Sequence, residues 1–186
     1  MPEIWLVRHG ETEWSRTGRH TGRTDVPLAP AGVEQALALR ERLASRRFAL
    51  VLSSPLQRAR ETCRLAGLGD AARLRDDLLE WSYGAYEGRT AAEIRGEVPG
   101  WTIWTGEVPG GESADDVAAR ARRLITEAVA APGDVALFGH GHVLRVLTAC
   151  WLELSPREGR RFALGTAGIG VLGHENGTRV LRSWNV

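Results

Sequence analysis

Hydrophobic residues in this chain form short runs separated by amphipathic segments. Ile4–Val7 and Ala49–Leu52 are apolar throughout. Residues 33–44, between them, place apolar side chains at helical spacing, with Arg and Glu at the other positions. Short apolar runs followed by such helices are typical of buried parallel strands. The pattern therefore predicts strands that alternate with helices.

The same alternation extends along the rest of the chain. Further strands are predicted at residues 72–74, 134–138, 168–172 and 178–184, and further helices begin near Pro55, Thr90, Ser113 and Val143. This order indicates an α/β fold: a doubly wound, mostly parallel sheet sandwiched by helices in three layers, with right-handed crossovers. We expect a single domain over residues 1–186, with an irregular, lid-like excursion at about residues 76–111.

Composition narrows the possible functions. The 186 residues have a formal net charge of +1, and no apolar stretch approaches the ~18 residues that a membrane span needs. We therefore expect no nucleic-acid partner, no membrane partner and a cytoplasmic location. All 24 basic residues are Arg, so an anion site here must use Arg, His, hydroxyl groups or backbone amides. Both a monomer and a homodimer are compatible with the sequence.

Two predicted strands end in a histidine beside glycine. Arg8 and His9 follow the first strand, and His140 follows the strand that ends at Phe138. If these strands are parallel neighbours, both histidines leave the same sheet edge, where α/β proteins bind ligands. The pair His140 and His142 would suit a metal, but no Cys or nearby carboxylate completes a ligand set, so we expect no metal. Paired phosphate chemistry and a structural role for His140 are the alternatives.

Two further charged residues could reach the same edge. Arg58 lies one turn into the helix that follows the second strand. The N-termini of the helices that begin after Ser54 and Gly139 offer backbone amide donors for an anion. Glu80, between Leu79 and Trp81, suits a proton donor. The alternatives are a solvated helix arginine and a surface glutamate in a loop.

Four sequence blocks carry a family resemblance. In order they are LVRHGETEW, SSPLQRARET, LLEWSYGAYEG and LFGHGHVLR, and together the chain resembles the histidine phosphatase, or phosphoglycerate-mutase-like, superfamily. The resemblance implies that fold, with His9 as the nucleophile that becomes phosphorylated and Glu80 as the proton donor. It makes Arg8, Arg58 and His140 the phosphate clamp. It also implies substrate contacts by Ser15, Thr21, Gly22 and Gly141, although Ser15 stands where many members have Asn.

Longer matches resemble one branch of that family. RHGETEWSRTGRHTGRTD, EWSYGAYEG and FGHGHVLR are similar to sedoheptulose-1,7-bisphosphatase-like enzymes and related acid phosphatases, in which Arg145 would meet a distal phosphate. The resemblance implies a metal-independent phosphomonoesterase that needs no cofactor and acts on small phosphorylated metabolites, such as sugar (bis)phosphates. The alternatives are a cofactor-dependent phosphoglycerate mutase and a non-catalytic phospholigand-binding member. The chain is shorter than typical mutases, which favours hydrolysis.

Overall fold

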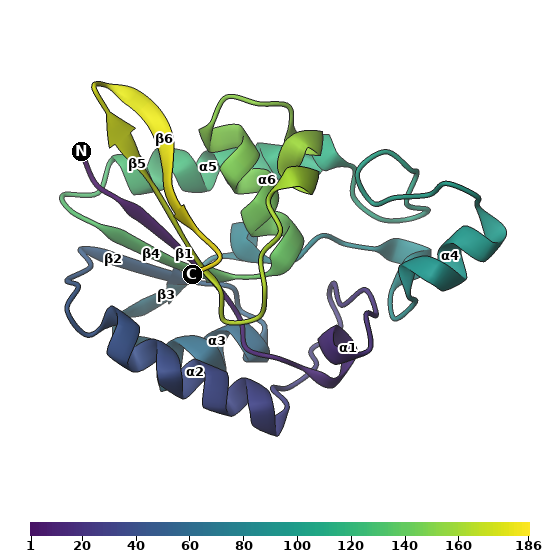
Figure 1. Cartoon of the computed structure of the whole chain (residues 1–186), viewed down its shortest axis with the longest axis horizontal. Helices are drawn as coiled ribbons and strands as arrows, with labels where there is room; N and C mark the ends of the chain where they lie inside the picture. The colour runs from purple at the N-terminus through teal and green to yellow at the C-terminus, as the bar shows by residue number, and fades with distance from the viewer.

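The apolar runs predicted as strands all lie in one sheet. The computed structural model describes residues 1–186, and its six strands follow the order β3-β2-β4-β1-β5-β6 (Figure 1). They are β1 (Ile4–Arg8), β2 (Leu50–Ser53), β3 (Ala72–Leu74), β4 (Val135–Gly139), β5 (Ile169–Glu175) and β6 (Thr178–Trp184). The first four strands pair in parallel, whereas β5 runs antiparallel to both of its neighbours. The predicted mostly parallel sheet is confirmed.

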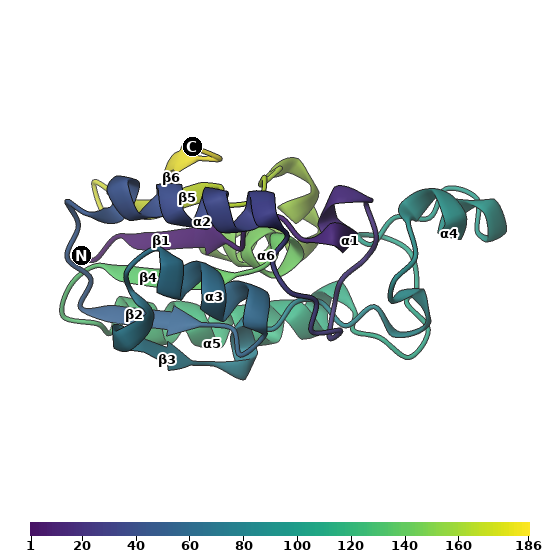
Figure 2. The same cartoon turned by 90° about the horizontal axis from the view of Figure 1, so that it is seen from below.

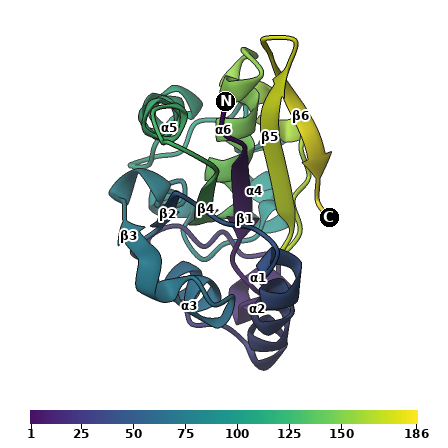
Figure 3. The same ribbon diagram turned by 90° about the vertical axis from the view of Figure 1, so that its left-hand side faces the viewer.

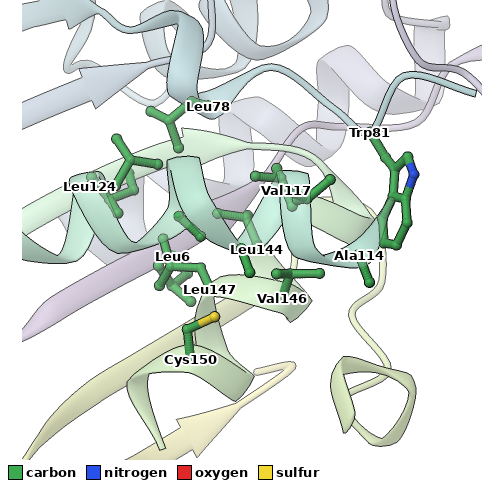
Figure 4. Close-up of a cluster of buried hydrophobic side chains, with 14 of the residues drawn as sticks. Leu6, Leu78, Trp81, Ala114, Val117, Leu124, Leu144, Val146, Leu147 and Cys150 are labelled. Carbon is green, nitrogen blue, oxygen red and sulfur yellow. The ribbon is translucent and has the colours of Figure 1, made fainter. Parts of the chain in front are cut away.

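Helices cover both faces of this sheet, which confirms the three-layer prediction. Seen along the sheet in Figure 3, α2 (Pro30–Leu43) and α3 (Gln57–Leu65) lie on one side, and α5 (Ala114–Val129) and α6 (Gly141–Trp151) lie on the other. Each face buries its own apolar cluster. Leu6 of β1, Leu124 of α5 and Leu147 of α6 belong to the larger cluster, drawn in Figure 4. None of the helices combines the length and apolar character needed to cross a bilayer.

The shorter helical elements include several that the pattern did not predict. Thr90 and Ser113 form the capping boxes that begin α4 (Ala91–Glu97) and α5. A further capping box at Thr12 begins α1 (Glu13–Arg16), which the hydrophobic pattern did not predict. Short 3₁₀ helices complete the set: η1 (Gly69–Ala71), η2 (Asp76–Leu78), η3 (Gly84–Tyr86) and η4 (Pro156–Arg161).

The excursion at residues 76–111 extends from the edge of the sheet at which β1 and β4 end. In Figure 2 it reaches well beyond the sheet, with α4 at its far end. Its base nevertheless belongs to the larger core, because Trp81, Trp101 and Trp104 are buried there. The backbone of His20 pairs with Gly88 and Arg89, which ties the N-terminal loop to the excursion. A lid function for this segment stays a prediction.

Candidate active site

The two strands that end in histidine are direct neighbours. β1 and β4 pair in parallel with Arg8 opposite Gly139, so His9 and His140 leave the same edge of the sheet. Their ring centroids lie 5.1 Å apart, and the His9 amide donates to the Gly139 carbonyl at 3.0 Å. The predicted juxtaposition of the two imidazoles is confirmed.

The tautomer of His9 is determined by the following residue. His9 Nδ1 lies 2.7 Å from the Gly10 carbonyl oxygen, which can only accept, so Nδ1 carries the hydrogen and Nε2 keeps its lone pair. The Gly10 peptide is itself fixed, because its amide donates to Thr62 Oγ1 at 3.0 Å. A Cβ on Gly10 would lie 2.3 Å from the Gly32 carbonyl oxygen, so only glycine allows α2 to pack against this turn.

The electrostatic surroundings keep His9 neutral. The ring is buried, and burial lowers the pKa of His9 well below its ordinary value, with the positive charges of Arg58 and Arg8 acting in the same direction. A neutral imidazole with a free Nε2 is a nucleophile at neutral pH.

Arg58 is a fully buried residue, so the solvated-arginine alternative is wrong. Its Nε donates to His140 Nδ1 at 3.1 Å, and its terminal nitrogens donate to carbonyls of residues 21, 22 and 24. Because His140 Nδ1 accepts from Arg58, its Nε2 carries the hydrogen and donates to Ser54 Oγ at 2.8 Å. Burial, reinforced by the charge of Arg58, lowers the pKa of His140 well below its ordinary value.

Glu80 is only 4% exposed, so the surface-loop alternative is also wrong. Its Oε1 accepts from the amides of Trp81 and Val143, both at 2.9 Å, and its Oε2 accepts from the amide of His142 at 3.0 Å. Two of these donors belong to the first turn of α6, whose amides have no acceptor within the helix, so they fix the orientation of the Glu80 carboxyl group.

These elements enclose a cavity of about 190 Å³. Seven of the predicted site residues line it: Arg8, His9, Ser15, Thr21, Glu80, Gly141 and Arg145. The remaining three, Arg58, His140 and Gly22, do not line the cavity. The Gly22 carbonyl oxygen accepts a hydrogen bond from Arg58. The structure therefore brings the predicted residues together, while the roles assigned to them stay predictions.

Two of the lining side chains are held by local contacts. Ser15 Oγ donates to the Thr12 carbonyl oxygen at 3.0 Å and accepts from the Thr12 amide. Its hydroxyl is therefore part of the capping box at the start of α1. Arg145 lies over the Trp104 ring at 4.7 Å, and donates to carbonyls of Gly159 and Arg160 at 3.0 Å. These contacts with protein groups fix the orientation of the Arg145 side chain at the cavity.

Sequence reasoning did not assign the aromatic part of the cavity wall. Tyr83, His20 and His142 all line the cavity. The Tyr83 hydroxyl lies 2.5 Å from His142 Nδ1, and the His20 ring stacks parallel to that of His142. His142 stands in the Gly-His-Gly-His block, but neither periodicity nor spacing indicated that residues 20 and 83 would meet it.

A second, larger hollow of about 480 Å³ lies on α3 and β3. Its polar side chains mostly pair with protein groups: Arg64 with Glu61, and Gln57 with the Asp25 backbone. The smaller cavity, with its histidines and buried charges, is the candidate active site. Nowhere do three or more His, Cys, Asp or Glu side chains gather closely enough to hold a metal ion.

The buried histidines predict a loss of stability in mild acid. The pKa values of His9, His140 and His142 all lie well below the unfolded value of about 6.5. The folded state then binds fewer protons than the unfolded state, so stability is complete above pH ~6.5 and is lost as the pH falls, by up to about 1.4 kcal/mol per pH unit for each histidine. Urea unfolding measured between pH 7.5 and 5 checks this.

Most of this window lies above the carboxyl titrations, because unfolded Asp and Glu have pKa values of about 3.9 and 4.3. The variant His142→Phe, which keeps a ring but no titratable group, should give a shallower slope. A constant or rising stability between pH 7.5 and 5 would contradict the prediction.

Comparison with known proteins agrees with this geometry. The model of the histidine phosphatase superfamily (branch 1) matches residues 4–186. An acid phosphatase of Mycobacterium tuberculosis is 41% identical over 182 residues, covering 96% of this chain and 89% of that protein. The sedoheptulose 1,7-bisphosphatase of Saccharomyces cerevisiae is 36% identical over 190 residues, covering 84% of this chain and 70% of the yeast protein. A solved structure of a Mycobacterium tuberculosis open reading frame product has a TM-score of 0.95 at 39% identity, covering 100% of this chain and 97% of that one.

Proposed function

This chain belongs to the histidine phosphatase superfamily (branch 1), and we propose that it hydrolyses phosphate monoesters through a phosphohistidine on His9. One observation carries the proposal. The proton on His9 Nδ1 is held by the Gly10 carbonyl, which leaves the Nε2 lone pair in a cavity that also presents Arg8 and Glu80.

In the first step, His9 Nε2 attacks phosphorus and the bond to the ester oxygen breaks. Glu80 gives its proton to the departing alkoxide, which leaves as an alcohol. Arg8, whose Nε is buried without a protein partner, is proposed to neutralise the phosphoryl oxygens, assisted by the positive charge of Arg58 and by the amide of Gly141, which lines the cavity. Phosphoryl transfer depends mainly on such positioning and charge neutralisation.

In the second step, water attacks the phosphorus of phospho-His9. The Glu80 carboxylate takes one proton from that water, the bond from phosphorus to Nε2 breaks, and inorganic phosphate leaves. Glu80 is then protonated and His9 is neutral again, so the cycle consumes one ester and one water. Two easier steps replace one difficult displacement.

Small phosphorylated metabolites, and sugar phosphates or bisphosphates in particular, are the proposed substrates. The yeast relative is a sedoheptulose 1,7-bisphosphatase, and the cavity is small and lined by Arg8, Arg19 and Arg145 but by a single carboxylate, Glu80. This excess of positive charge favours a substrate with a second anionic group, which Arg145 is positioned to meet. A cytoplasmic location and the oligomeric state stay predictions.

Phosphate release from a panel of esters tests the proposal. The panel holds sedoheptulose and fructose bisphosphates, sugar monophosphates, both phosphoglycerates and p-nitrophenyl phosphate, with His9→Ala as the blank. We expect hydrolysis with preference for a bisphosphate. Stimulation by 2,3-bisphosphoglycerate together with isomerisation of phosphoglycerate would instead identify a mutase, and binding without turnover would identify a non-catalytic member.

Removal of metal ions should leave the activity unchanged. Arg8, Arg58 and amide groups provide the positive charge that a metal would otherwise supply to the phosphoryl oxygens. The measurement is turnover before and after exhaustive dialysis against a chelator, with zinc or magnesium added back. A loss that either metal restores would contradict a metal-independent mechanism.

A further inference from the structure

The segment that carries Glu80 is anchored by a buried arginine of α5. Arg120 Nη1 donates to the carbonyl oxygens of Asp77, at 2.8 Å, and Leu79, at 2.5 Å. Its Nε and Nη2 donate to the two carboxylate oxygens of Glu112, at 2.9 and 3.1 Å. The Arg120 side chain is only 7% exposed. One guanidinium therefore joins the chain just before Glu80 to the residue that precedes the α5 cap.

Glu112 holds the chain on the other side of Glu80. Its Oε2 accepts from the Ser82 amide at 2.8 Å, and its carbonyl oxygen accepts from the Trp81 indole nitrogen at 2.7 Å. The Glu112 amide donates to the Ser82 carbonyl oxygen at 2.9 Å. Figure 4 shows Leu78 and Trp81, on either side of this segment, lying against α5. Protein groups thus fix the backbone both before and after Glu80.

We propose that Arg120 and Glu112 form a positioning pair that keeps the Glu80 carboxyl at the place where it exchanges a proton with the substrate. The inference rests on the proposed function, because it gives the pair a role only if Glu80 is the proton donor. Neither residue lines the cavity, so both would act through Glu80 rather than on the substrate. A displacement of about 1 Å at a reacting group can lower a rate about 100-fold.

The same helix offers a matched control. Arg123, one turn further along α5, also reaches the segment before Glu80, through a bidentate pair with the Asp77 side chain. Its side chain is 63% exposed, and it contacts a side chain rather than the backbone. Exposed ion pairs contribute little to stability or position, so Arg123→Met should behave as the parent protein.

The experiment compares two leaving groups in Arg120→Met. An alkoxide needs the proton from Glu80 to leave, whereas p-nitrophenolate leaves without one. We expect kcat/KM for the best sugar phosphate of the panel, which reports the step in which the alkoxide leaves, to fall ~10- to 100-fold, and kcat/KM for p-nitrophenyl phosphate to change less than about threefold. An equal loss of kcat/KM on both esters in a folded Arg120→Met protein would overturn the proposal.

A double variant separates positioning through Glu80 from a general structural role. If Arg120 acts through Glu80, then Glu80→Gln/Arg120→Met should lose no more sugar-phosphate activity than Glu80→Gln alone. Additive losses would overturn the proposal. An active His9→Ala protein, or equal slowing of both esters by Glu80→Gln, would instead refute the proposed function and this inference with it.

Folding is checked by circular dichroism and thermal unfolding of each variant. If Arg120→Met does not fold, Glu112→Gln provides the same comparison, because its amide oxygen can still accept from the Ser82 amide while the charge opposite Arg120 is lost. The same selective loss on the sugar phosphate is expected. A folded Glu112→Gln protein with parental activity on both esters would refute the role of the pair.

Discussion

Replacing His9 with alanine should abolish phosphate release from every ester in the panel, by about 10⁴-fold or more. The reason is that His9 Nε2 is a neutral nitrogen with a free lone pair in a cavity that also presents Arg8 and Glu80. Alanine leaves Glu80 and the arginines in place, but no group on which a phosphoenzyme could form. The measurement is steady-state phosphate release together with intact-mass detection of the phosphorylated protein.

A remote histidine supplies the control for this variant. His174 lies in β5 against the Trp151 ring, away from the cavity, so His174→Ala should retain the parental turnover and the phosphoenzyme mass shift. Comparable turnover in His9→Ala would refute the nucleophile assignment. A phosphorylated His9→Ala protein would assign the nucleophile to a different residue.

Glu80→Gln should lower kcat/KM for sugar phosphates about 10²- to 10⁴-fold and kcat/KM for p-nitrophenyl phosphate far less, because kcat/KM reports the step in which the leaving group departs. Glutamine has nearly the same shape, and its oxygen can still accept from the Trp81 and Val143 amides, so the site should survive with one lost hydrogen bond to the His142 amide. What disappears is the ability to give a proton to the leaving alkoxide and, in the second step, to take one from water. Rates for a series of leaving groups of graded pKa would show a steeper dependence in the variant.

An exposed glutamate of α4 makes a matched control for this substitution. Glu97 has a side chain that is 66% exposed and pairs with Arg89, so Glu97→Gln should leave both rates unchanged. An equal fall in kcat/KM for the sugar and nitrophenyl esters in Glu80→Gln would count against proton donation by Glu80.

The sequence by itself was sufficient for the layers of the fold, and it predicted that His9 and His140 meet on the condition that their two strands are neighbours. Short apolar runs between amphipathic helices allow few arrangements other than a mostly parallel sheet covered on both faces. Once two such strands are neighbours, the residues after them must share an edge, as Arg8 opposite Gly139 confirms. The family resemblance of the four blocks added the roles, which no periodicity carries.

The tertiary structure alone decided how these groups are held. The Gly10 carbonyl and Arg58 set the tautomers of His9 and His140. Backbone oxygens of the N-terminal loop accept hydrogen bonds from Arg58, and amides of α6 donate to the Glu80 carboxylate. The contact between Arg120 and the segment around Glu80 spans more than forty positions, as its 43- and 41-residue separations show. A hydrophobic pattern reports which side chains are buried, but hydrogen-bond partners depend on directions and distances between distant segments. Those are defined only when the helices have packed onto the sheet.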